Sequence, residues 1–200
     1  MKKPLKWVMK SPFGPPIYIA TDGDHTWKIS PEFGGLAYID FKEHPNEVET
    51  SDILFNVGYA QGIEEAKIAV EILRCGTNHL PDWREQLLNA GLCQTKHERR
   101  FEAGKSEEWI DTKTGRFQIK IKTSEHCNQS EWEETVSCFY RAHKERKWFN
   151  VSSIAGREFR GELVPSPLPE GLCGLKAGIA VALAIRNARL KRGGQFFRPI

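Results

Sequence analysis

The stretch Gly62–Leu73, GIEEAKIAVEIL, organises the expected fold of this chain. Its apolar residues recur at mixed i+3 and i+4 spacing, which predicts a short amphipathic α-helix. Glu64 and Glu65 stand in the first turn, where the helix dipole favours negative charge, and Gly76 follows as a stop. We expect this helix to close a β-sheet unit, because such helices usually bury their apolar face in their own fold. The alternative is a helix presented to a partner.

The same pattern returns near the C-terminus, where Gly174–Val181 repeats the motif Ala-x-Ile-Ala-Val. A second echo relates two sets of residues at equal spacing: Trp27, Gly35 and Tyr38, then Trp148, Gly156 and Phe159. Two matches in one order favour a tandem arrangement. The predicted fold class is therefore α+β, with two antiparallel β-sheet-plus-helix units joined by a short helix, and duplication is left open as their origin. The predicted domains are residues 1–92 and 107–200.

In the first unit, short β-rich runs alternate with turns, which predicts an antiparallel meander before the helix. The Asp-Gly pair at Asp22-Gly23 is typical of a tight hairpin turn. Residues 42–52 are polar and largely acidic, as in an exposed loop. The strands are expected over residues 6–9, 17–20, 27–30, 36–41 and 53–59.

The connector and second unit begin with a short helix over 81–88, with Pro81 near its first turn. Residues 94–106 are charged and lack periodicity, so the unit boundary is placed there. A hairpin is predicted between 109–112 and 116–122, since Phe117, Ile119 and Ile121 alternate with polar residues. Ser130 and the acids after it predict a helix to about residue 146. Strands over 148–154 and 157–164 and a buried helix over 170–190 complete the prediction.

Composition sets broad bounds on the function. The chain has 200 residues, 10% of them aromatic and 28% charged, with a net charge of +3. Such mild basicity permits nucleic-acid binding without arguing for it. Five widely spaced cysteines indicate reduced thiols, as in the cytoplasm. The N-terminus lacks a signal-peptide core, and the longest apolar run, Gly178–Ile185, is too short to span a bilayer. The expected location is the cytoplasm, with no membrane partner.

Several residues of the first third support a resemblance. They are Trp7, the turn Ser11–Gly14, Tyr18-Ile19, Trp27 and the helix pattern Gly62-x-Glu64-Glu65-Ala66-Lys67-x-Ala69. This set resembles small sheet-plus-helix accessory proteins of phages and prophages. The helix is also loosely similar to the last helix of double-stranded-RNA-binding domains, although their Lys-Lys-x-Ala-Lys phosphate clamp is missing. The phage resemblance implies accessory or counter-defence biology, in which small proteins bind and block host machinery inside the host cytoplasm.

Three patterns suggest catalysis or metal binding, and each has a simpler explanation. Cysteines and histidines at 93, 97, 126, 127, 138 and 143 offer zinc ligands but form no Cys-x-x-Cys knuckle. Pro81-Asp82 and Gln118-Ile119-Lys120 mimic a metal-dependent nuclease motif, with Gln118 in place of the acid. Asp22-Gly23-Asp24-His25 is better explained as a hairpin turn than as a cation site. We therefore expect no catalytic residue, cofactor or metal, and rank a nuclease as a distant third function.

Clusters of basic residues are the stronger functional signal. They group at the end of the predicted helix over 130–146, at the C-terminus and on the predicted hairpin, with Trp148 and Phe196-Phe197 nearby. Such charges can hold phosphates while aromatic rings stack on bases. The simpler explanation is solvated helix ends, where the dipole favours cations. The candidate binding residues are Lys120, Lys122, Arg141, Lys144, Arg146, Lys147, Arg189, Lys191, Arg192, Phe196, Phe197 and Arg198.

The function predicted from the sequence is non-enzymatic binding. The first form is a phage-type accessory or counter-defence inhibitor that binds a host nucleic-acid-handling protein complex. The second is a direct DNA- or RNA-binding protein. The segment after Gly194 carries two adjacent phenylalanines beside a basic residue, which is typical of a contact surface. Its expected contact is the chain itself, a second copy in a homodimer, or a target. Deleting it should leave the fold intact and weaken self-association or target binding.

Overall fold

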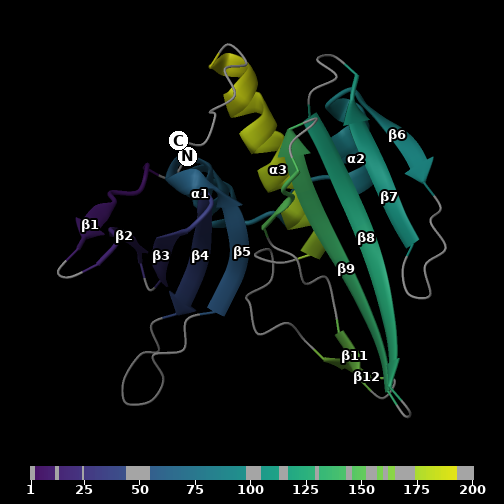
Figure 1. Ribbon diagram of the computed structural model, residues 1–200, viewed down its shortest axis with the longest axis horizontal. Helices are drawn as coiled ribbons and strands as arrows, with labels where there is room; N and C mark the ends of the chain where they lie inside the picture. The colour runs from purple at the N-terminus through teal and green to yellow at the C-terminus, as the bar shows by residue number, and fades with distance from the viewer. Residues whose placement is uncertain are drawn as a thin grey trace.

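The computed structural model describes residues 3–11, 14–23, 25–43, 55–97, 105–112, 117–128, 131–142, 146–151, 157–159, 162–164 and 174–192. They form three helices and twelve strands, ten of which make one antiparallel sheet with the order β1-β2-β3-β4-β5-β10-β9-β8-β7-β6 (Figure 1). The elements, in chain order, are β1 (Val8–Lys10), β2 (Ile17–Asp22), β3 (His25–Glu32), β4 (Leu36–Glu43), β5 (Phe55–Gln61), α1 (Gly62–Leu73), α2 (Trp83–Asn89), β6 (Leu92–His97), β7 (Lys105–Asp111), β8 (Phe117–Asn128), β9 (Glu131–Ala142), β10 (Phe149–Val151), β11 (Arg157–Phe159), β12 (Glu162–Val164) and α3 (Gly174–Lys191).

The predicted α+β class is confirmed, and so are the helix over 62–73 and the meander that precedes it. Positive-φ glycines serve the turns: Gly23, at φ +60°, joins β2 to β3, as the Asp-Gly pair indicates. The predicted hairpin around 113–115 is also confirmed, because β7 pairs with β8 from Lys105↔Thr123 to Ile110↔Gln118.

The prediction of a helix over 130–146 is wrong. The chain instead forms β9, which pairs along its full length with β8, from Phe117↔Ala142 to Asn128↔Glu131. Its described end alternates with period two, since Cys138 and Tyr140 are buried while Phe139 and Arg141 are partly exposed. Cross-strand pairing with β8 therefore overrides the helix signal of the serine cap and early acids.

The two predicted sheets are one continuous sheet. They meet where β10 pairs with β5, through Asn150↔Tyr59 and Val151↔Gly58. Of the stretch 94–106, residues 94–97 belong to β6 and 105–106 to β7, and these two strands pair with each other. The echoed tryptophans differ in position: Trp27 is buried in the middle of β3, whereas Trp148 precedes β10 and is partly exposed. The echo also predicts that Trp148 is buried like Trp27, and this prediction is wrong.

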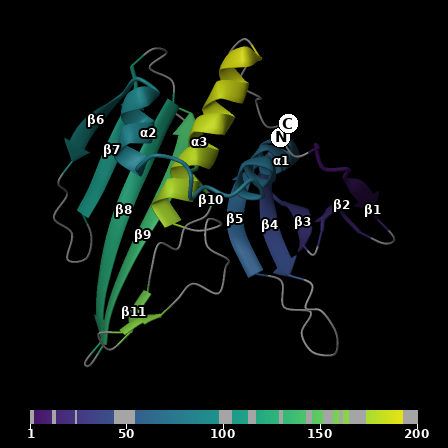
Figure 2. The same ribbon diagram turned by 180° about the vertical axis from the view of Figure 1, so that it is seen from behind.

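All three helices lie on one face of the sheet, and Figure 2 shows them in front of it. Helix α1 contacts β3, β4 and β5, while α3 contacts β8, β9 and β10 as well as α1 and α2. The echoed motifs supply buried residues to this layer, including Ala69, Val70 and Val181, as predicted. The core therefore fills the space between the sheet and the helices, and Figure 1 looks onto the opposite face.

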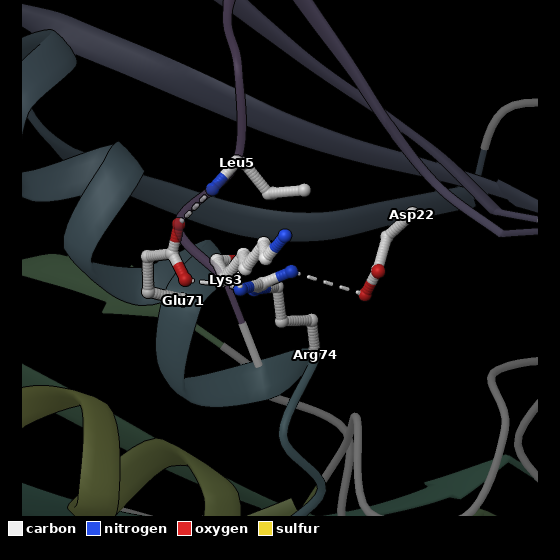
Figure 3. Close-up of polar contacts among 5 residues, drawn as sticks. All are labelled: Lys3, Leu5, Asp22, Glu71 and Arg74. Carbon is white, nitrogen blue, oxygen red and sulfur yellow. Dashed lines mark hydrogen bonds and ion pairs between the residues drawn. The ribbon is translucent and has the colours of Figure 1, made fainter. Parts of the chain in front are cut away.

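A polar clamp fastens the N-terminal segment to the end of α1 (Figure 3). Arg74 Nε donates to Glu71 Oε2 at 2.7 Å, and its Nη1 lies 3.3 Å from Asp22 Oδ2 on β2. Arg74 Nη2 also donates to the backbone carbonyl of Lys3, and Glu71 Oε1 accepts from the Leu5 amide at 2.9 Å. One guanidinium thus joins three parts of the chain at the C-terminal end of α1, where cations are favoured.

Candidate binding surface on the open face of the sheet

A row of side chains crosses the sheet on the face away from the helices. The cross-strand partners run in sequence as Tyr38↔Tyr59, Tyr59↔Asn150, Asn150↔Phe139 and Phe139↔Lys120. We call these five residues the aromatic row. Their chain neighbours point the other way and are buried, as Ala37, Ile39, Ala60, Ile119 and Tyr140 show. The row therefore belongs to the face that no described helix covers.

Trp148 lies beside this row and is contacted by two cations. The Arg141 guanidinium carbon lies 4.1 Å from the centre of the Trp148 ring, and Lys120 Nζ lies 5.7 Å from it. Arg141 Nε also donates to Gln118 Oε1 at 2.8 Å, which holds the guanidinium against the ring. Lys120 Nζ lies 4.0 Å from Glu108 Oε1. The result is a cation–aromatic cluster whose members are partly exposed.

The other end of the row is a pair of tyrosines. The Tyr38 and Tyr59 rings are 5.9 Å apart and tilted by 55°, within the usual range for aromatic pairs. Burial raises the pKa of Tyr59, and the neighbouring Tyr38 hydroxyl raises it further. Between this pair and Phe139, the buried Asn150 Oδ1 has no hydrogen-bond partner among the described residues.

More cations stand where the chain leaves β9. Arg146 and Lys147 are exposed, and Lys147 lies against the β3–β4 turn: a Cβ on Gly34 would come within 3.2 Å of Lys147 Nζ. Phe33 in the same turn is 98% exposed. Since Arg141 also lies toward this end of β9, positive charge gathers along one side of the aromatic row.

Of the twelve predicted binding residues, the structure brings together Lys120, Arg141, Arg146 and Lys147. Lys120 lies on the β7–β8 hairpin, as predicted, whereas the predicted helix end that carries Arg141, Arg146 and Lys147 is wrong, because Arg141 lies on strand β9 and the other two follow it. Lys191 and Arg192 are exposed at the end of α3, in the helical layer. The side chain of Lys122 and all of Lys144, Phe196, Phe197 and Arg198 fall outside the described residues.

Arg189, also a predicted binding residue, instead forms hydrogen bonds within the protein. Its Nε donates to Glu65 Oε1 at 2.7 Å and its Nη2 donates to Gln61 Oε1 at 2.6 Å, which ties α3 to the start of α1. The Tyr140 hydroxyl donates to Glu65 Oε2 at 2.9 Å and accepts from the Gln61 amide at 3.2 Å. Burial, chiefly, and the Glu65 charge raise the pKa of Tyr140 well above 10.0.

Sequence reasoning missed most of the aromatic row. Tyr38, Tyr59, Phe139 and Asn150 were not candidates, although Tyr38 alternates with the buried Ala37 and Ile39. That period-two pattern assigns Tyr38 to the outer face of β4 and was a usable signal. Phe139 had no such signal, because its stretch was interpreted as a helix.

The residues of the catalytic and metal alternatives have other roles where they are described. Asp82 caps α2, since its Oδ1 accepts from the Arg84 amide at 2.9 Å. Gln118 holds Arg141 on the open face. Cys93 is exposed on β6 while Cys138 is buried, and burial raises the Cys138 pKa to about 12. Within the described ranges, no three His, Cys, Asp or Glu side chains form a metal-binding group.

No family model, curated protein or solved structure matches this chain. Among the helices that the structure describes, none has the length and apolar character needed to cross a membrane.

Proposed function

We propose that this chain is a non-enzymatic binding protein that engages nucleic-acid-handling machinery through the open face of its sheet. The observation that carries the proposal is the placement of Trp148 between Arg141 and Lys120, next to the exposed Arg146 and Lys147. Tryptophan and arginine are the residues most enriched at binding hot spots. On this face they pack against each other at the surface instead of filling the core.

In its first form the partner is a host protein complex, and the chain is a phage-type accessory or counter-defence inhibitor in the host cytoplasm. The resemblance of its first third to phage accessory proteins supports this form. The Ala-x-Ile-Ala-Val echo in α1 and α3 is the sequence feature behind a proposed origin by duplication. Two halves joined edge to edge would provide one wide surface for a large partner.

In its second form the chain binds DNA or RNA directly. The cation–aromatic cluster favours this form, because guanidinium and ammonium groups bind phosphates while an adjacent indole ring stacks on a base. The cations along one side of the aromatic row would then track a phosphate backbone.

The experiment compares two arginines with matched geometry. Arg84 in α2 stacks on Trp83 at 4.1 Å, the same distance as Arg141 from Trp148, but it lies in the helical layer. Tagged parent, Arg141→Glu and Arg84→Glu chains are expressed in bacteria, and captured proteins are identified with and without nuclease treatment. Parent and Arg84→Glu should capture the same nucleic-acid-handling proteins, and Arg141→Glu should lose them.

The nuclease arm separates the two forms. Capture that survives digestion indicates a protein partner, whereas capture that is lost, with oligonucleotide binding by the purified chain, indicates direct binding. Equal capture by Arg141→Glu and the parent would contradict any role for the open face.

A further inference from the structure

We propose that the aromatic row is a stacking platform for single-stranded nucleic acid, in which Tyr38, Tyr59, Phe139 and Trp148 each offer a ring to a base. This inference rests on the direct-binding form of the proposed function and specifies its ligand. The proposal is based on the arrangement of these rings, which come from four separate segments of the chain and lie on one face of the sheet.

The row has the spacing of a multi-base site. Adjacent strands in a sheet lie about 4.8 Å apart, so β4 to β9, three strand steps away, spans about 14 Å. Over that distance the row passes Tyr38, Tyr59 and Phe139, with Trp148 to one side of it. Several bases can therefore contact rings at once without deformation of the sheet.

The geometry favours single strands over duplexes. In a duplex the base faces are stacked on each other, and only base edges line the grooves. Aromatic rings on a broad sheet meet base faces, which are accessible where bases are unpaired. Among the described residues, no helix protrudes from this face to enter a major groove.

Charge complements the rings. Arg141 lies near the end of β9, Arg146 and Lys147 precede β10, and Lys147 reaches the β3–β4 turn, so a phosphate backbone would run along this end of the row beside its stacked bases. Two acids near the face, Asp40 and Glu108, each have a lysine within 4.0 Å: Lys28 at 3.8 Å and Lys120 at 4.0 Å. These two acids are thus locally offset, and the exposed Arg146 and Lys147 can contact phosphates.

The test is a fluorescence-anisotropy titration with labelled DNA and RNA, single-stranded and hairpin duplex, of about 16 nucleotides, at two salt concentrations. Tyr59→Leu, Phe139→Leu and Trp148→Leu remove one ring each and keep an apolar side chain. Each should weaken single-strand binding about tenfold, since stacking supplies about that much per base. Trp148→Phe should restore much of the loss, and Arg84→Glu should match the parent.

The salt dependence of the affinity distinguishes the contribution of the aromatic rings from that of the charged side chains. The leucine variants should keep the parent's slope of log affinity against log salt, whereas Arg141→Ala should reduce it by about 0.7, the value for one phosphate contact on a single strand. The ratio of DNA to RNA affinity then identifies which of the two single strands is bound.

Three results would overturn the inference, and they bear differently on the proposed function. If duplexes bind as tightly as single strands, or if the leucine variants bind like the parent while Arg141→Ala does not, direct binding stands and the stacking platform fails. If no oligonucleotide binds and nuclease-resistant capture is observed, the open face recognises a protein. If no oligonucleotide binds and Arg141→Glu leaves capture unchanged, both proposals fail.

Discussion

The two faces of the sheet use arginine in opposite ways. On the helix face Arg186 is 4% exposed and forms a bidentate pair with the fully buried Asp111, at 2.9 and 3.0 Å. On the open face Arg141 lies over an indole ring and is partly exposed. The buried Arg186 joins α3 to the sheet, whereas the partly exposed Arg141 packs on a ring at the surface and reaches solvent in part. Removing each should therefore affect different properties.

The largest effect is expected from Asp111→Ala on the helix face. This change leaves the Arg186 guanidinium buried without its carboxylate, which typically costs about 3–5 kcal/mol. Urea unfolding should show the loss as a lower midpoint. The double variant Asp111→Leu with Arg186→Met should recover much of the stability, since it removes both buried charges. Equal stability of Asp111→Ala and the parent would mean that the pair does not hold α3 on the sheet.

A smaller effect is expected from Tyr140→Phe, about 1–2 kcal/mol, because the hydrogen bond to Glu65 and the acceptor for the Gln61 amide are both lost. The same residue predicts a pH dependence. Its folded pKa lies above the ordinary 10.0, so the folded chain holds a proton that the unfolded chain releases. The contribution of Tyr140 to the free energy of unfolding should be constant below about pH 10 and should decline above that pH.

Unfolding midpoints of parent and Tyr140→Phe, measured from about pH 9 to about pH 11, should converge as pH rises. Cys138 adds to the decline in both chains, since its pKa moves from 9.0 to about 12. Parallel curves for the two chains would show that Tyr140 does not contribute to the alkaline loss.

On the open face, Trp148→Leu and Arg141→Gln should change stability by less than Asp111→Ala, by about 1 kcal/mol, because both residues are partly exposed and the Gln118 amide keeps access to a new partner. Their effect should fall on binding, in the titrations described above. Urea midpoints should be measured for the same variants as the affinities. If Arg141→Gln lowers both the unfolding midpoint and the affinity, Arg141 is needed for the fold and its loss of binding is not specific.

The smallest effect concerns the ionisation of Tyr59. Its pKa should exceed 10.0, and Tyr38→Phe should lower it only in part, because burial is the larger cause of the shift and the Tyr38 hydroxyl the smaller. An NMR titration of the ring carbons measures both values. If Tyr38→Phe returns the Tyr59 pKa fully to 10.0, Tyr38 and not burial is the main cause of the raised Tyr59 pKa.

Local patterns predicted much of the fold because their signals are short in range. Helix α1 was predicted from its periodicity, the meander from turns such as Asp22-Gly23, and the β7–β8 hairpin from the alternation of Phe117, Ile119 and Ile121. The prediction was wrong at β9, where a serine followed by acids resembles the start of a helix. Only the pairing with β8 shows that this stretch is a strand.

Sequence patterns were therefore enough to predict the α+β class, most elements of the first half, and the kinds of residue present for binding: cations near aromatic rings. Tertiary structure alone decided that ten strands form one sheet and that Tyr38, Tyr59, Phe139 and Trp148 share a face. It also separated Arg189, committed to Glu65 and Gln61, from Arg141 beside Trp148. Which strands become neighbours depends on contacts between residues far apart in the chain. A period-two pattern assigns residues to two faces of a strand, but it does not indicate which of those faces the helices cover.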